Sequence, residues 1–345
     1  TRHHSRGFSL VELMVALVIT LILLAGIGQI FLSSKKSYVI QDTLGRMQEN
    51  GRYAMDELTA DLRRAGYSGG NSDLSTIQGS LGINDTNTEA CPNTTAGPST
   101  WARMLNRGVF GLNLSGTELP STTSYGCIQN SGASPYIRGD VLAVRYADTS
   151  EVGGITTPLA TGQTIADAYP NQLFLRSSLF RGRVFQGTNS ESIVNDLDAP
   201  ALRTSLLVAR AYYIGESNNA SRCPNDGPVP SLYRINVVNG AFVSEEVAYG
   251  VDNLQLEYGI DSDNSGSVNR YYDADSISTN PATTPNWNQV IAARVWMLTR
   301  AECPETGYTN SNTYGMSENY TPADTANRGY RRKLYTSTVK LRNNS

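Results

Sequence analysis

The sequence predicts an α+β protein in which a long N-terminal α-helix packs on an antiparallel β-sheet that carries long loop insertions. Three observations lead to this fold class. An apolar segment near the N-terminus continues without proline into an amphipathic helical pattern. The second half of the chain holds runs of β-branched and aromatic residues, some with clear period-two alternation. Between them lies a region rich in Gly, Ser, Thr, Asn and Pro, which is typical of loops.

The apolar segment is long enough to cross a membrane as a helix. Residues 13–34 contain no charged side chain, and about 20 apolar residues span the hydrocarbon core of a bilayer. Glu12 stands at the start of this segment. A carboxylate near the bilayer centre costs roughly 2.5–3.5 kcal/mol, so an acid at this place indicates a function and needs a partner.

The helical pattern continues beyond the apolar segment. Small or apolar residues recur there in steps of three and four, which traces one face of a helix: Leu44, Met47, Gly51, Ala54, Leu58, Leu62 and Ala65. Most of the other positions are polar and include Asp61, and Gly66 is the expected C-cap. We therefore expect one helix from Phe8 to Ala65 whose second half offers one face to a sheet.

The remainder of the chain is predicted to be mainly strands. The segments richest in β-branched and aromatic residues are 137–146, 172–176, 204–214, 232–238, 242–247, 254–260, 290–299 and 334–341. In residues 254–260 apolar side chains alternate with Gln255 and Glu257, which predicts a sheet with one buried and one solvent-exposed face. Asn239-Gly240 predicts a two-residue hairpin turn.

Composition argues against two classes of function. The formal net charge is −3 and the chain has no long basic block, so a nucleic-acid partner is not expected. Both histidines, His3 and His4, lie in the first few residues. If that segment is removed, nucleophiles activated by histidine and metal sites ligated by histidine are excluded. We therefore do not expect an enzyme.

The four cysteines predict disulfides in an oxidising compartment. Cys91, Cys127, Cys223 and Cys303 are widely spaced and contain no C-x-x-C pair. Three pairings are available. Loop closure favours joining near neighbours, which gives Cys91–Cys127 and Cys223–Cys303. The alternative is four free, buried thiols.

A segment near residue 265 has the opening of a calcium loop. Oxygen-bearing side chains stand at alternate positions, with a glycine for the sharp turn, as in an EF-hand; the ligands would be Asp261, Asp263, Ser265 and Ser267. The twelfth position is Tyr272 and not glutamate, although Asp273 and Asp275 lie nearby. The favoured alternative is a polar hairpin turn. No cofactor other than calcium is expected.

Gly7-Phe8-Ser9-Leu10-Val11-Glu12 resembles the class III signal of type IV pilins and type II secretion pseudopilins. The resemblance implies that a prepilin peptidase cleaves between Gly7 and Phe8 and methylates the new amino terminus of Phe8. It also implies a role for Glu12 in assembly, in which the carboxylate meets the Phe8 amine of a neighbouring subunit. The alternative is an ordinary signal anchor.

Three C-terminal segments resemble the PilW branch of minor pilins: residues 250–259, 294–298 and 339–343. The resemblance implies a minor pilin that helps to prime type IV pili and is incorporated into them, with a tip complex as one location. Such a protein would support motility, adhesion or DNA uptake. The alternative within this layout is a J-type minor pseudopilin of a type II secretion system.

The resemblance to pilins also implies the domains, partners and location of the protein. Residues 1–7 are the leader, 8–34 the transmembrane and assembly helix, 35–67 its amphipathic extension, 68–135 a loop-rich insertion and 136–345 the sheet domain. The implied partners are other minor pilins, the major pilin, prepilin peptidase, the inner-membrane assembly platform and a large tip adhesin. The implied location is the inner membrane of a Gram-negative bacterium, with a periplasmic C-terminal domain, and then the pilus on the cell surface.

Overall fold

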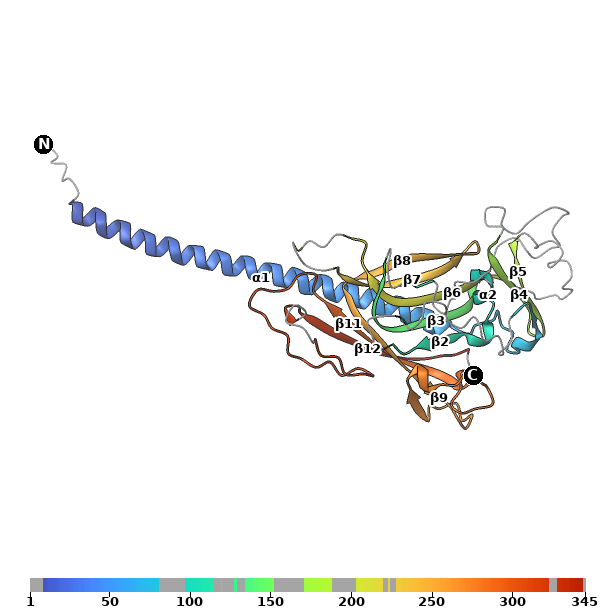
Figure 1. Ribbon diagram of the computed structural model, residues 1–345. Helices are drawn as coiled ribbons and strands as arrows, with labels where there is room; N and C mark the ends of the chain where they lie inside the picture. The colour runs from blue at the N-terminus through green and yellow to red at the C-terminus, as the bar shows by residue number, and fades with distance from the viewer. Residues whose placement is uncertain are drawn as a thin grey trace. The chain divides into compact units, whose positions relative to one another are not determined.

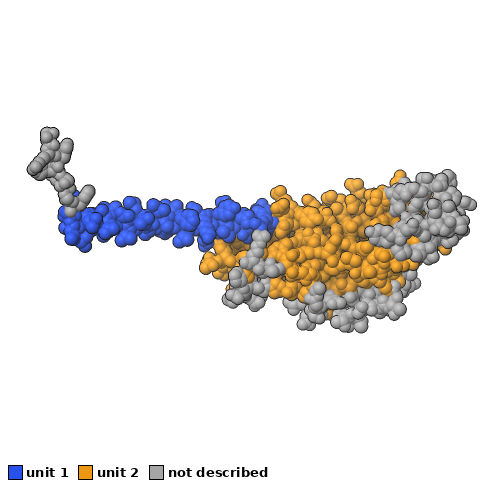
Figure 2. Space-filling view, turned by 90° about the horizontal axis from the view of Figure 1, so that it is seen from above, with its two compact units in different colours: residues 1–48 blue, residues 49–345 orange. Residues whose placement is uncertain are grey.

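The computed structural model describes residues 9–80, 97–114, 119, 127–128, 134–151, 171–187, 203–219, 223, 228–322 and 328–343. The chain divides into two compact units, residues 1–48 and residues 49–345 (Figure 2). The division falls inside helix α1 (Leu10–Arg64), which begins in the first unit and ends in the second. The long helix predicted from the sequence is confirmed, and Phe8 lies outside the described residues.

Helix α1 ends at the predicted glycine. Gly66 has φ +77°, a left-handed conformation that glycine adopts without steric cost. Its N–H donates to the carbonyl oxygen of Arg145 at 2.9 Å, which turns the chain away from the helix axis and onto a strand.

Most of the described strands form one mainly antiparallel sheet (Figure 1). Strand β6 lies at its centre, with β3 along one side, while β4 and β7 share the other side. Strand β8 follows β7, and the order along the main path is β1-β5-β4-β6-β3-β2, with only β1 and β5 parallel. The bounds are β1 Ile77–Gln78, β2 Val109–Leu112, β3 Tyr136–Glu151, β4 Leu173–Ser177, β5 Gly182–Gln186, β6 Arg203–Glu216, β7 Pro230–Val238 and β8 Ala241–Tyr249.

A second antiparallel sheet has the order β10-β9-β11-β12. Its strands are β9 Val251–Ile260, β10 Arg270–Tyr272, β11 Val290–Arg300 and β12 Arg332–Lys340. Short helices occur in the connections: α2 Gly97–Ala102, and the 3₁₀ helices η1 Leu74–Thr76, η2 Leu105–Arg107, η4 Ala274–Ser276 and η5 Trp287–Gln289.

Each strand segment predicted from the sequence coincides with an observed strand. The hairpin turn between β7 and β8 is also confirmed, because Asn239 and Gly240 both have positive φ, at 48° and 77°. Besides β1 and β10, which have only two and three residues, the sequence analysis missed β2 and β5. Each contains a glycine and is only four or five residues long, so the β-propensity signal is weak.

The prediction that β9 has one solvent-exposed face is wrong. Gln255 is buried and Glu257 is partly buried, because the segment at residues 316–318 covers that face. The side-chain oxygen of Gln255 accepts the N–H of Glu318 at 2.7 Å. The covering segment comes from about 60 residues further along the chain, so the alternation of apolar and polar residues in β9 cannot indicate it.

The last turns of α1 pack on both sheets. Ala54, Leu58 and Leu62 are completely buried and belong to one core with the strands of both sheets. Gly51 allows the closest approach, because a Cβ atom there would overlap the ring of Tyr335 on β12. The amphipathic face predicted over residues 51–65 is therefore the face that the sheets cover.

Candidate functional site

Helix α1 begins with a reciprocal cap formed by Ser9 and Glu12. The hydroxyl oxygen of Ser9 accepts the N–H of Val11 at 3.3 Å, and the N–H of Ser9 donates to Glu12 Oε2 at 3.2 Å. This is the arrangement of a capping box, which satisfies N–H groups that a helix start leaves without partners. Glu12 is exposed, and its carboxylate has no positively charged partner among the described residues. Gly7 and Phe8 lie outside the described residues.

The apolar segment that follows Glu12 is not covered by any other described part of the chain. Its large apolar side chains from Leu10 to Leu32 are between 52% and 74% exposed. In the described part of the chain, α1 is the one helix whose length and composition would let it cross a membrane, and its most apolar stretch is not buried at all. Such a surface requires lipid or other helices around it.

A second acid, Asp61, lies near the other end of α1 and is buried. Asp61 is 2% exposed and accepts hydrogen bonds on both carboxylate oxygens. The Nη1 atom of Arg210 lies 2.8 Å and 2.9 Å from the two oxygens, and the hydroxyls of Tyr146 and Tyr212 donate at 2.7 Å and 2.5 Å. The sequence pattern assigned Asp61 to the polar face of the helix, which is wrong, because β3 and β6 bring these partners onto it.

The two tyrosines at Asp61 act as donors because they hold their protons. Burial, reinforced by the negative charge of Asp61, raises the pKa of Tyr146 to about 12 and raises that of Tyr212 further. Both phenols therefore stay neutral at physiological pH and bond to the carboxylate. Glu57, one turn earlier on α1, adds an ion pair with Arg234 of β7 at 2.9 Å. These contacts fasten the last turns of α1 to the first sheet.

A third acid, Asp252 on β9, links the two sheets. Arg332 of β12 donates from Nε to Oδ2 at 2.6 Å, and Arg138 of β3 lies 3.6 Å from Oδ1. Burial acts to raise the pKa of Asp252, but the charges of Arg138, Arg332 and Arg300 outweigh it and hold the pKa below its usual value. The carboxylate is therefore ionised and ties the C-terminal strand to β3.

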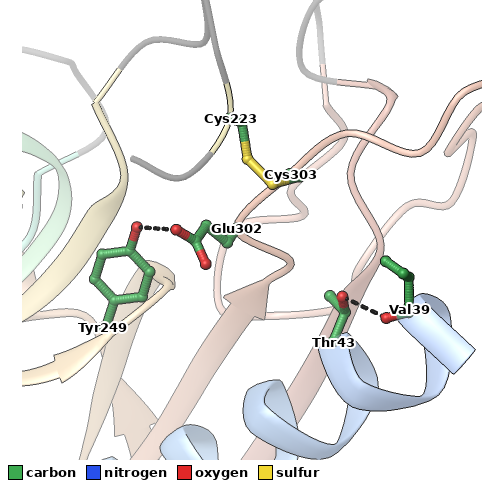
Figure 3. The surroundings of a disulfide bond; sticks show 6 residues. All are labelled: Val39, Thr43, Cys223, Tyr249, Glu302 and Cys303. Carbon is green, nitrogen blue, oxygen red and sulfur yellow. Dashed lines mark hydrogen bonds between the residues drawn. A yellow bond between two sulfur atoms is a disulfide. The ribbon is translucent and has the colours of Figure 1, made fainter. Parts of the chain in front are cut away.

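Cys223 and Cys303 form a disulfide with a Cα–Cα distance of 5.6 Å (Figure 3). The bond is one half of the predicted pairing and closes a separation of 80 residues. Beside it, the hydroxyl of Tyr249 donates to Glu302 at 3.1 Å. Cys91 lies outside the described residues, so the predicted Cys91–Cys127 bond stays a prediction.

The loop predicted as a calcium site is held by bonds of its own. Asp261 accepts the N–H of Ser265 at 3.0 Å on one oxygen and that of Gly266 at 2.7 Å on the other. Asp263 accepts the N–H of Ser265 at 3.2 Å, whereas Ser267 makes no hydrogen bond with the described part of the chain. No group of three or more His, Cys, Asp or Glu side chains gathers for a metal in the described part of the chain.

The missing twelfth ligand is not replaced. Tyr272 is paired with Tyr258 in the sheet, and Asp273 accepts the hydroxyl of Ser317. Two nearby carboxylates are few for Ca²⁺, which takes six to eight oxygen ligands. The donor set therefore fits calcium poorly and fits a polar turn well, and calcium at this loop stays a prediction.

The site therefore consists of the start of α1 and its apolar segment, and sequence reasoning found only part of it. It identified Glu12 and the apolar segment but not the role of Ser9. The Ser-x-x-Glu spacing that forms the cap was visible in the sequence. It also missed Arg210 and the two tyrosines at Asp61, for which no local signal exists.

Comparisons with known proteins fall on both ends of the chain. Residues 211–343 match the model of the type IV pilus-assembly protein W family, and residues 2–28 match the prokaryotic N-terminal methylation motif. A search of curated proteins gave no match. Among solved structures, a type IV-like pilin from Thermus thermophilus is 13% identical, with 68% of this chain and 84% of that chain covered and a TM-score of 0.27. That score is too low to support an inference.

The first match begins inside β6 and ends after β12, so it includes the whole second sheet with Asp252, Arg332 and the disulfide. The second includes the Ser9–Glu12 cap and most of the apolar segment. The resemblance to the PilW family of type IV pilus minor pilins is thereby confirmed at both ends of the chain.

Proposed function

We propose that this protein helps to prime the assembly of type IV pili and is itself incorporated into them, with the apolar half of α1 as the assembly element. The observation that carries the proposal is the exposure of that half, whose large apolar side chains are all more than half exposed. In a lipid bilayer these side chains are covered by acyl chains, and in a filament by the helices of neighbouring subunits. The same surface therefore serves both states.

Glu12 gives the transfer between these two states its specificity. After cleavage at Gly7, the amine of Phe8 is a positive charge about one helical turn from Glu12. An unpaired charge among packed apolar helices is strongly destabilising, whereas a carboxylate and an amine from neighbouring subunits offset each other. Oε2 of Glu12 binds the N–H of Ser9, and a carboxylate has capacity for further donors.

The proposal includes the processing steps and the partners that this mechanism needs. Prepilin peptidase removes residues 1–7 and methylates Phe8. Other minor pilins and the major pilin supply the neighbouring helices, and the inner-membrane platform extracts the subunit. Before assembly the protein is held in the inner membrane of a Gram-negative cell with its larger unit in the periplasm. A place in a tip complex with a large adhesin follows if the subunit enters first.

Deletion of the gene tests the assembly role. We expect a strong loss of surface filaments, counted by electron microscopy, and of twitching motility, both restored by the gene in trans. Mass spectrometry of the complementing protein should find N-methylated Phe8 as its first residue. Normal piliation and motility in the deletion strain would contradict the proposal. Loss of protein secretion with normal piliation would instead indicate the pseudopilin role.

A further inference from the structure

A polar cavity of about 500 Å³ lies where α1 ends. Four separate parts of the chain line it: the loop after α1 at residues 66–75, η2 through Asn106, η5 through Asn288, and the C-terminal Arg342 and Asn343. Small-molecule sites have volumes of roughly 300–1,000 Å³, so the cavity has the capacity for such a ligand. Most of the lining side chains are amides, hydroxyls or charged groups, which does not suit an apolar ligand.

The wall formed by the loop is rigid. Asn71 is buried, accepts the N–H of Asp73 at 2.8 Å and donates to Thr76 at 2.9 Å. Gly69 has φ +69° and a Cβ atom there would collide with Ser177 of β4, so the loop follows a path that needs glycine. Asn343, also in the lining, donates to the carbonyl oxygens of Arg64 and Ala65 at 3.5 Å and 3.4 Å. The cavity is therefore built from several tertiary contacts.

Asn106 points to a ligand. Its side-chain nitrogen and oxygen are both shielded from solvent, yet neither has a hydrogen-bond partner within the described residues. Native proteins rarely leave a buried polar group without a partner unless a molecule or water is bound to it. An amide needs an acceptor for its nitrogen and a donor for its oxygen. A sugar hydroxyl supplies both.

The charges in the cavity specify the ligand further. Arg342 is exposed and makes no ion pair or hydrogen bond with the described part of the chain. The carboxylate of Asp73 is already engaged, because it accepts the N–H of Ser75 at 3.0 Å and its hydroxyl at 2.5 Å. Arg342 is thus a cation available to a ligand, and a guanidinium binds a carboxylate through two parallel hydrogen bonds.

We propose that this cavity binds a sugar acid, such as a hexuronate unit of an acidic polysaccharide. Arg342 pairs with the carboxylate, while Asn106 binds ring hydroxyls through both of its amide atoms. Asn288 donates to a hydroxyl from its amide nitrogen, because its oxygen already accepts Arg107 Nη1 at 3.1 Å. Inorganic phosphate fits less well, because it offers mainly acceptors to the oxygen of Asn106 and brings up to two negative charges to one arginine, whereas a hexuronate brings one negative charge. A sugar site of this kind adds a recognition function to the subunit, independent of how it enters a filament.

The test is titration calorimetry on the full chain in detergent micelles with D-glucuronate, D-glucose and inorganic phosphate. We expect saturable binding of glucuronate, at least roughly tenfold weaker binding of glucose, and weak or no binding of phosphate, because hydrogen bonds to a charged group are worth about 1.5–3 kcal/mol. Failure of glucuronate to bind would overturn the proposal, as would phosphate binding of equal strength.

Two variants and one control locate the binding. Arg342→Gln should weaken glucuronate binding roughly tenfold and leave glucose binding unchanged. Asn106→Leu should weaken the binding of both sugars, with folding checked by the melting temperature. Arg63→Gln removes the same charge from an exposed position near the end of α1, outside the cavity lining, and should change neither. Equal losses from Arg63→Gln and Arg342→Gln would show attraction by surface charge and contradict the site.

Discussion

Helix α1 carries two acids with opposite surroundings. Glu12, near its start, is exposed, and within the described residues its carboxylate meets only the N–H of Ser9. Asp61, near its end, is buried and saturated by one arginine and two tyrosines. The apolar side chains follow the same division, because Leu23 is 61% exposed and Leu58 is not exposed at all. Among the described residues, the first half of the helix lacks the kind of partners that the second half has.

The different surroundings of Asp61 and Glu12 distinguish contacts that stabilise the folded chain from contacts that we propose other molecules make. Around Asp61 the partners come from strands of the same chain, so these contacts contribute to folding. Around Glu12 the described residues supply neither a charged partner nor an apolar cover, and our proposal assigns both to lipid and to other subunits. The comparison therefore predicts that substitutions in the second half act on stability, whereas those in the first half act on assembly.

The largest expected effect on stability comes from Asp61→Asn. The variant leaves the guanidinium of Arg210 without its counter-charge in a largely buried place, and breaking such a pair costs about 3–5 kcal/mol. Urea unfolding of the full chain in micelles measures it. Asp42→Asn is the matched control, because the Asp42–Arg46 pair on the same helix is about half exposed and such pairs contribute about 0–1 kcal/mol. Equal effects of the two variants would contradict the comparison.

Apolar truncations sharpen the same contrast. Leu58→Ala should lower the free energy of unfolding by about 3 kcal/mol, because it opens a cavity in the core. Leu23→Ala removes the same atoms from an exposed position and should change the free energy of unfolding by less than about 0.5 kcal/mol. A large loss of stability from Leu23→Ala would mean that the first half of α1 has partners within its own chain.

Asp140 on β3 is a buried acid that should make the stability of the fold depend on pH. Burial raises the pKa of Asp140 to about 7, although its carboxylate accepts the N–H groups of Leu114 and Leu256. The unfolded chain releases this proton near pH 4. Between about pH 4 and pH 7 the folded state therefore holds a proton that the unfolded state has lost. As the pH rises through this range, the contribution of Asp140 to the free energy of unfolding should fall by about 1 kcal/mol per pH unit.

Asp140→Asn isolates that contribution. Urea unfolding of wild type and variant at pH 5 and pH 7 should show a difference between them that changes over this range, because only wild type loses the stability that depends on the proton. Parallel pH profiles would contradict the assignment.

The fold could be predicted where its cause is local. The periodicity of apolar residues in α1 and in the main strands reflects which side chains face the core. Asn239-Gly240 forms a hairpin turn that needs positive φ at both residues. Local pattern failed where distant segments meet. Asp61 seemed exposed because the sequence around it does not show Arg210, and Gln255 seemed exposed because Glu318 is far along the chain.

The candidate site divides in the same way. Glu12 was found because its motif is contiguous, and the same six residues contain the spacing of the capping box. The cavity at the end of α1 could not be found, because Asn71, Asn106, Asn288 and Arg342 come from four separate parts of the chain. Only the folded chain brings their amides and charge together.

Incorporation of Glu12 variants into filaments tests the central claim, that Glu12 acts through its charge on a neighbouring amine. Glutamine at this position keeps the cap with Ser9 but loses the charge, whereas alanine loses both. At equal membrane levels, the amount of each variant in sheared pili is measured by immunoblotting. We predict that Glu12→Gln and Glu12→Ala are both depleted roughly 100-fold, the equivalent of about 2.5–3.5 kcal/mol for an unpaired charge. Ser9→Ala should incorporate nearly normally. Normal incorporation of Glu12→Gln would contradict the claim, because the cap alone would then be sufficient.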